Sequence, residues 1–137
     1  MKIIAKLLLL LPVIVLTGAA TEVTYQYPQR PIFVIQSVEC IRTTSGSDTD
    51  TVYISRQPEG ARYPKGTFTM SAGEKATVGR YFYPKAPGSI ALYEEDSLTA
   101  DDEIGKFNFT TAEKSGTYVI TMTGDGAEYR VTIQVRN

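Results

Sequence analysis

The chain of 137 residues contains no histidine. Without an imidazole group, the protein cannot use Ser-His or Cys-His nucleophile pairs or histidine-based acid–base catalysis. The commonest zinc sites are excluded for the same reason. Carboxylates and lysine remain as possible catalytic groups, but the common catalytic arrangements that need histidine are missing.

Cysteine is nearly absent as well, because Cys40 is the only one in the chain. An intramolecular disulfide is therefore impossible, which excludes a small secreted fold held together by disulfides. In the stretch FVIQSVECIR, Cys40 alternates with Val38 and Val34. This spacing predicts that Cys40 is a small buried hydrophobe, with intermolecular pairing as the alternative.

The first twenty residues, MKIIAKLLLLLPVIVLTGAA, have the layout of a secretory signal. Lys2 and Lys6 precede an apolar run, and small residues follow up to Ala20. The uninterrupted apolar run is about half of the ~20 residues that span a bilayer, so a retained anchor is the weaker alternative. We therefore predict cleavage after Ala19 or Ala20 and a secreted protein, extracellular or periplasmic.

Removal of residues 1–20 leaves 12 basic and 15 acidic residues and a net charge of −3. No basic patch or stripe is present, so a nucleic-acid partner is not expected. The remaining 117 residues are enough for one domain with a modest core. Residues 21–31, with two prolines and no helical periodicity, predict an extended lead-in or linker.

The rest of the chain reads as eight short segments rich in Val, Ile, Thr, Tyr and Phe, bounded by turn residues. They cover residues 31–44, 51–57, 66–73, 76–84, 88–96, 104–111, 115–124 and 127–137. Strict alternation in the last two, joined by Gly124-Asp125-Gly126, predicts a hairpin. The pattern predicts an all-β fold, an antiparallel eight-stranded β-sandwich over residues 32–137.

Six acidic residues and no basic residue lie between Glu94 and Glu103. Period-two alternation projects Glu94 and Asp96 together where a strand ends, and the chain then returns to Asp102. Three uncompensated carboxylates at ~4–6 Å would raise one another's pKa values, and a hard cation such as calcium would remove that repulsion. A solvated acidic loop that serves only solubility is the alternative.

These residues resemble a known family. Tyr93-Glu94-Glu95-Asp96 followed by Asp102-Glu103-Ile104-Gly105 is similar to the third calcium loop of C2 domains. The resemblance implies a C2-like sandwich that binds calcium through acidic loops at one end. The implied metal ligands are Glu94, Asp96 and Asp102, and Asp101 is an adjacent possibility. In the first calcium loop, Asp48 and Asp50 are both candidates, and the spacing does not choose between them.

We therefore expect a secreted, non-enzymatic, C2-like module with a structural or docking role. A protein or anionic-lipid partner is conceivable, although Leu98 is the only large apolar residue at the loop tips. Arg56, Arg62 and Lys65 are expected to be solvated strand and turn charges. The alternative function is an immunoglobulin-like adhesive or assembly sandwich without metal. The sequence leaves the partner and the oligomeric state open.

Overall fold

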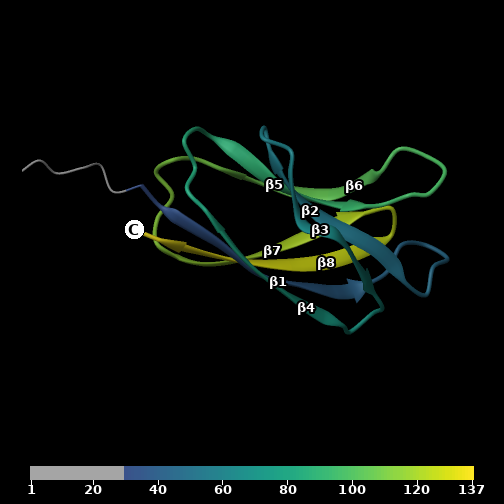
Figure 1. The fold of residues 1–137 in the computed structure, drawn as a ribbon. Coiled ribbons are helices and arrows are strands. Elements are labelled where there is room, and N and C mark those ends of the chain that lie inside the picture. The colour runs from purple at the N-terminus through teal and green to yellow at the C-terminus, as the bar shows by residue number, and fades with distance from the viewer. Residues whose placement is uncertain (1–29) are drawn as a thin grey trace, which may run out of the picture.

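The computed structural model describes residues 30–137 (Figure 1). The predicted signal segment 1–20 and residues 21–29 of the lead-in lie outside the described part. All eight predicted strands are present. They are β1 Ile32–Arg42, β2 Asp50–Gln57, β3 Ala61–Met70, β4 Lys75–Phe82, β5 Gly88–Glu94, β6 Asp102–Phe109, β7 Gly116–Gly124 and β8 Ala127–Arg136. Within residues 30–137 there is no helix long and apolar enough to cross a membrane.

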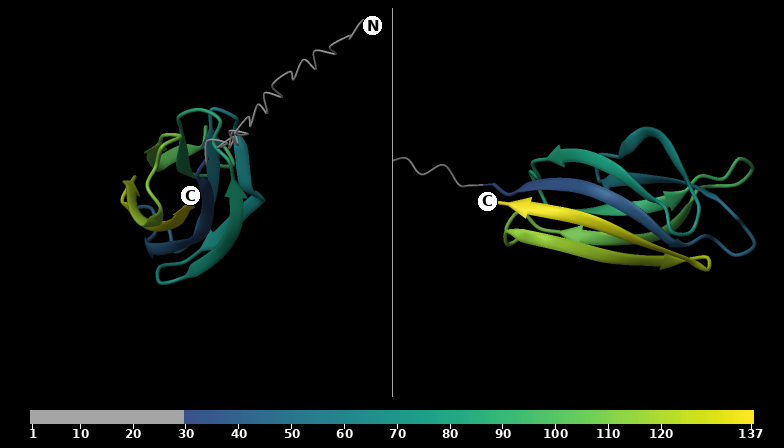
Figure 2. Two further views of the ribbon diagram at one scale, coloured as in Figure 1. Left: turned by 90° about the vertical axis from the view of Figure 1, so that its left-hand side faces the viewer. Right: turned by 90° about the horizontal axis from the view of Figure 1, so that it is seen from below.

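The strands form two four-stranded sheets that pack face to face (Figures 1 and 2). One sheet has the order β4-β1-β8-β7 and the other the order β3-β2-β5-β6. Every strand pair is antiparallel. This arrangement confirms the predicted eight-stranded antiparallel β-sandwich.

Strand β3 begins at Ala61, earlier than the predicted start at Gly66. Tyr63 pairs with Ile54 of β2, and the register then shifts before Phe68 pairs with Val52. Pro64 and Gly66 fall inside this irregular stretch, and both residue types are typical of turns rather than strands. The start of β3 is therefore fixed by pairing with β2 and not by local propensity.

A β-bulge in β1 changes which side chains face the core. Phe33 and Ile35 are buried before the bulge, whereas Val38 and Cys40 are buried after it. Cys40 is fully buried, as predicted. Val34, however, is only half-buried and does not share the face of Cys40, because one extra residue in a strand reverses the alternation.

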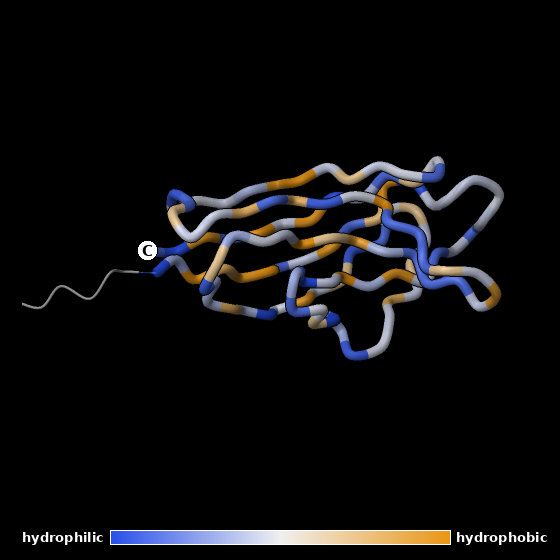
Figure 3. The backbone as a smooth tube through the Cα atoms, turned by 90° about the horizontal axis from the view of Figure 1, so that it is seen from above, coloured by the Kyte–Doolittle hydropathy of each residue, from blue (hydrophilic) through white to orange (hydrophobic). Residues whose placement is uncertain are grey.

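Hydrophobic residues are concentrated along the strands, and the connecting loops are mostly hydrophilic (Figure 3). The loops 43–49 and 95–101 and the turn 125–126 extend from one end of the sandwich, which we call the acidic end (Figure 1). The loops 58–60, 83–87 and 110–115 lie at the opposite end. The six clustered acids therefore belong to the acidic end.

Candidate functional site

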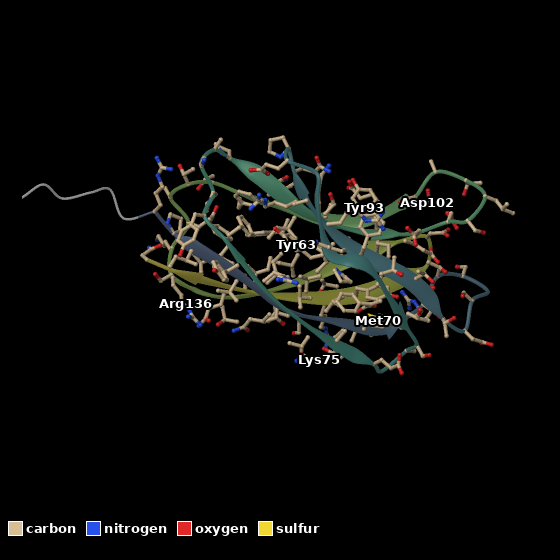
Figure 4. The ribbon with its side chains drawn as sticks, in the orientation of Figure 1. Tyr63, Met70, Lys75, Tyr93, Asp102 and Arg136 are labelled. Atoms are coloured by element: carbon tan, nitrogen blue, oxygen red, sulfur yellow. The ribbon has the colours of Figure 1, made fainter. Side chains whose placement is uncertain are left out.

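The pleat of β5 and β6 divides the acidic stretch into two groups. The first group is Glu95, Asp101 and Glu103, and the second group is Glu94, Asp96 and Asp102. Tyr93 pairs with Glu103, and Glu94 pairs with Asp102. Residues directly opposite each other on antiparallel strands project to the same face, about 4.5–5.5 Å apart at Cβ. Glu94 and Asp102 are therefore neighbours on one face. Figure 4 shows Tyr93 and Asp102 towards the acidic end.

The first group lies on the outer face of the β3-β2-β5-β6 sheet and is compensated by neighbouring side chains. The rings of Tyr53 and Tyr93 stack with centroids 5.4 Å apart, and the guanidinium carbon of Arg62 lies 3.5 Å from the Tyr53 centroid. Arg62 also donates to Glu95 at 3.0 Å. Arg62 is thus a packed residue that covers an aromatic ring, rather than the solvated charge expected from the sequence.

The tyrosine hydroxyls satisfy the remaining outer acids. The Tyr53 hydroxyl donates to Asp101 at 2.6 Å, and the Tyr93 hydroxyl donates to Glu103 at 3.2 Å. Lys106 also lies 3.6 Å from Glu103. Burial, and then the bond to Asp101, raise the pKa of Tyr53 to about 12. Asp101, an adjacent candidate for metal binding, is therefore tied to the sheet.

The second group faces the end of the sandwich between the two sheets and has Glu94 at its centre. Burial raises the pKa of Glu94, and the negative charges of Asp50, Asp96 and Asp125 raise it further. The Thr44 hydroxyl donates to Glu94 at 3.2 Å and opposes this shift. The groups that shift this pKa include no lysine or arginine. The second group is thus the uncompensated half of the acidic stretch.

Asp50 is fully buried below this group and is already satisfied by protein donors. The Thr44 backbone amide lies 3.1 and 3.0 Å from its two carboxylate oxygens, and the Thr44 hydroxyl donates at 2.8 Å. The Tyr129 hydroxyl donates at 2.7 Å. Asp50 therefore anchors the loop 43–49 to the sandwich, whereas Asp48 is exposed in that loop.

The carboxylate oxygens of the second group are of the kind that calcium binds, since calcium takes carboxylate, carbonyl and water oxygens. Their arrangement matches a calcium site less well. Within residues 30–137, no group of three or more His, Cys, Asp or Glu side chains is placed so that it could hold a metal ion. The structure brings Glu94 beside Asp96 and Asp102 but does not form a closed set of ligands.

The sequence analysis missed the groups that organise this end. Thr44, Arg62 and Tyr129 act across long sequence separations, which no spacing rule reveals. Tyr53 and Tyr93 could have been found, because alternation places both on outward faces of strands.

No protein-family model matches the chain, and no curated protein matches its sequence. Among solved structures, the fold is similar to one described as the structure of a C2 domain. The TM-score is 0.50 at 13% identity, over 80% of this chain and 100% of the other. The chain therefore has a C2-like β-sandwich fold, as the sequence resemblance implied.

Other similar structures come from extended synaptotagmins. A C2 domain of plant extended synaptotagmin 1 has a TM-score of 0.49 at 8% identity, over 77% of this chain and 91% of that domain. A structure with two C2 domains of extended synaptotagmin 2 has a TM-score of 0.47 at 12% identity, over 98% of this chain and 48% of the other.

Proposed function

We propose that this chain is a secreted, non-enzymatic C2-like binding module whose acidic end binds calcium weakly. The observation that carries the proposal is the placement of Glu94, which is partly buried and lies opposite Asp102 on the paired strands β5 and β6. Burial raises its pKa, and the negative charges of Asp50, Asp96 and Asp125 raise it further. A bound cation would remove the repulsion among these carboxylates. The fold and the lack of histidine support a binding role rather than catalysis.

The proposed ligands are Glu94, Asp96 and Asp102. Asp50 contributes negative charge near Glu94, but its oxygens are occupied by Thr44 and Tyr129. When bound, calcium would supply only positive charge and oxygen coordination, in a structural or partner-docking role. Extracellular modules commonly bind calcium at ~10⁻⁴–10⁻³ M, which an open set of carboxylates could provide.

Thermal unfolding of the purified protein in calcium and in chelator tests the proposal. At 100 times the dissociation constant, a ligand adds about 2.7 kcal/mol, which raises Tm by several degrees. The shift is expected in the wild type and in Asp48→Asn, and it should be lost in a double variant with Asp96→Asn and Asp102→Asn. Asp48→Asn is the control because Asp48 is exposed on a neighbouring loop.

No shift at calcium concentrations up to ~100 mM, about 100 times the weakest expected dissociation constant, would reject the calcium proposal and leave a metal-free adhesive or assembly module. An equal loss in Asp48→Asn would show that the ligands are wrongly assigned. Secretion is tested separately, by the mass of the exported protein, which should begin after Ala19 or Ala20. Sedimentation with anionic liposomes, with and without calcium, tests lipid docking.

A further inference from the structure

The loop 95–101 carries an apolar side chain at the acidic end. Leu98 is 95% exposed, more than any other large hydrophobic side chain described in residues 30–137. A single exposed leucine is ordinary on a protein surface. Leu98 lies in the loop that joins β5 and β6, and an apolar hollow lies at the other end of this hairpin.

At the opposite end, the structure has a shallow, mainly apolar hollow that is largely open to solvent and has a volume of about 630 Å³. It is lined in part by Gln57, Pro58, Pro87, Ser89, Asn108 and Phe109. Ser89 pairs with Gln57 on one side and with Asn108 on the other, so the hollow spans three strands. A hollow of this size and character can accept an aliphatic side chain.

The two ends also differ in charge. Glu94, Asp96 and Asp102 lie at the acidic end, whereas Lys85 and Lys114 are exposed in the loops of the opposite end. In the described part of the chain, neither of these lysines forms an ion pair.

Two acids in the loops of this end have partners within the chain. Glu59 pairs with Arg56 at 3.3 Å, and Glu113 accepts from the Thr110 amide at 2.9 Å. Among the described residues, neither acid forms an ion pair with Lys85 or Lys114, so both lysines are available to an acidic partner.

We propose that two copies of this chain associate head to tail, with Leu98 of one copy in the hollow of the next. The acidic residues around Leu98 would then approach Lys85 and Lys114 of the neighbouring copy. Because the leucine and the hollow lie at opposite ends of one hairpin, the contact is heterologous and can repeat, which gives a ring or an open linear assembly rather than a two-fold symmetric dimer.

Cysteine trapping tests the register of this contact. The full-length protein is expressed as separate Leu98→Cys and Ser89→Cys variants, which are mixed in chelator at low salt and oxidised. The native Cys40 is buried and stays out of the reaction. A disulfide between the two variants is expected, and no such product should form between Leu98→Cys and Val119→Cys, whose exposed position lies on β7. Equal trapping with Val119→Cys would overturn the proposal, and so would a disulfide confined to pairs of Leu98→Cys.

Sedimentation equilibrium provides a second measurement without engineered thiols. Leu98→Ser should weaken self-association about tenfold or more, because a buried leucine is replaced by a polar residue. Val119→Ser should leave it unchanged, and added salt should weaken it in the wild type. A wild type that stays monomeric at millimolar concentration would overturn the proposal. So would a Leu98→Ser variant that self-associates normally but no longer sediments with anionic vesicles, since Leu98 would then serve a membrane.

Discussion

The hydroxyl of Tyr129 donates a hydrogen bond to the carboxylate of Asp50 at 2.7 Å, and both residues are fully buried. Tyr129 lies on β8 and Asp50 on β2, so the bond joins the two sheets across the core. The same carboxylate accepts bonds from Thr44, which fixes the loop 43–49. One buried polar cluster therefore holds the acidic end together.

Replacement of Tyr129 by phenylalanine should destabilise the protein by about 1.5–3 kcal/mol, as expected when a hydrogen bond to a buried charged group is lost. The measurement is urea unfolding near neutral pH. Tyr118→Phe is the matched control, because its hydroxyl donates to the Lys114 carbonyl at an exposed site. Equal losses in the two variants would mean that the bond to Asp50 does not support the sandwich.

Replacement of Glu94 by glutamine should stabilise the protein at neutral pH. The folded-state pKa of Glu94 is raised above its ordinary value of 4.5, chiefly by burial and then by Asp50. Its ionised form therefore opposes folding, and this cost develops as pH rises from the ordinary value through the raised one. The advantage of Glu94→Gln over the wild type should be largest at about pH 7–8 in chelator and should vanish towards about pH 4.

Asp48→Asn is the control for this pH series, because it removes one negative charge from an exposed position on the same end. Asp48→Asn should not reproduce the gain in stability expected of Glu94→Gln. A Glu94→Gln variant that is less stable than the wild type at about pH 7.5 in chelator would contradict the expected sign.

Replacement of Arg62 by alanine should cost about 1 kcal/mol. Stacking of a partly exposed guanidinium over Tyr53 contributes about 0.5–1 kcal/mol, and the exposed ion pair with Glu95 adds less than about 1 kcal/mol. Arg62→Lys keeps the charge but loses the planar stack, so it should lie between the wild type and Arg62→Ala. The measurement is urea unfolding.

A double-mutant cycle with Glu95→Gln separates the two contributions of Arg62. The coupling should be a few tenths of a kcal/mol and should fall with added salt. A coupling that accounts for the whole loss would assign the role of Arg62 to the ion pair rather than to Tyr53.

The strand pattern was predictable because side-chain alternation and turn residues are local properties of the chain. The hairpin of β7 and β8 follows from strict alternation on both sides of Gly124-Asp125-Gly126. The bulge in β1 and the start of β3 were not predictable, because both depend on register with partner strands.

The sequence by itself determined an all-β chain with eight strands and an acidic loop, and its alternation projected Glu94 and Asp96 together where a strand ends. Only the tertiary structure decided which acids are compensated. Glu95 is paired by Arg62, and Asp50 is held by Tyr129 from the opposite sheet. The reason is physical: alternation fixes the direction of a side chain, whereas its charge environment depends on residues that only folding brings near.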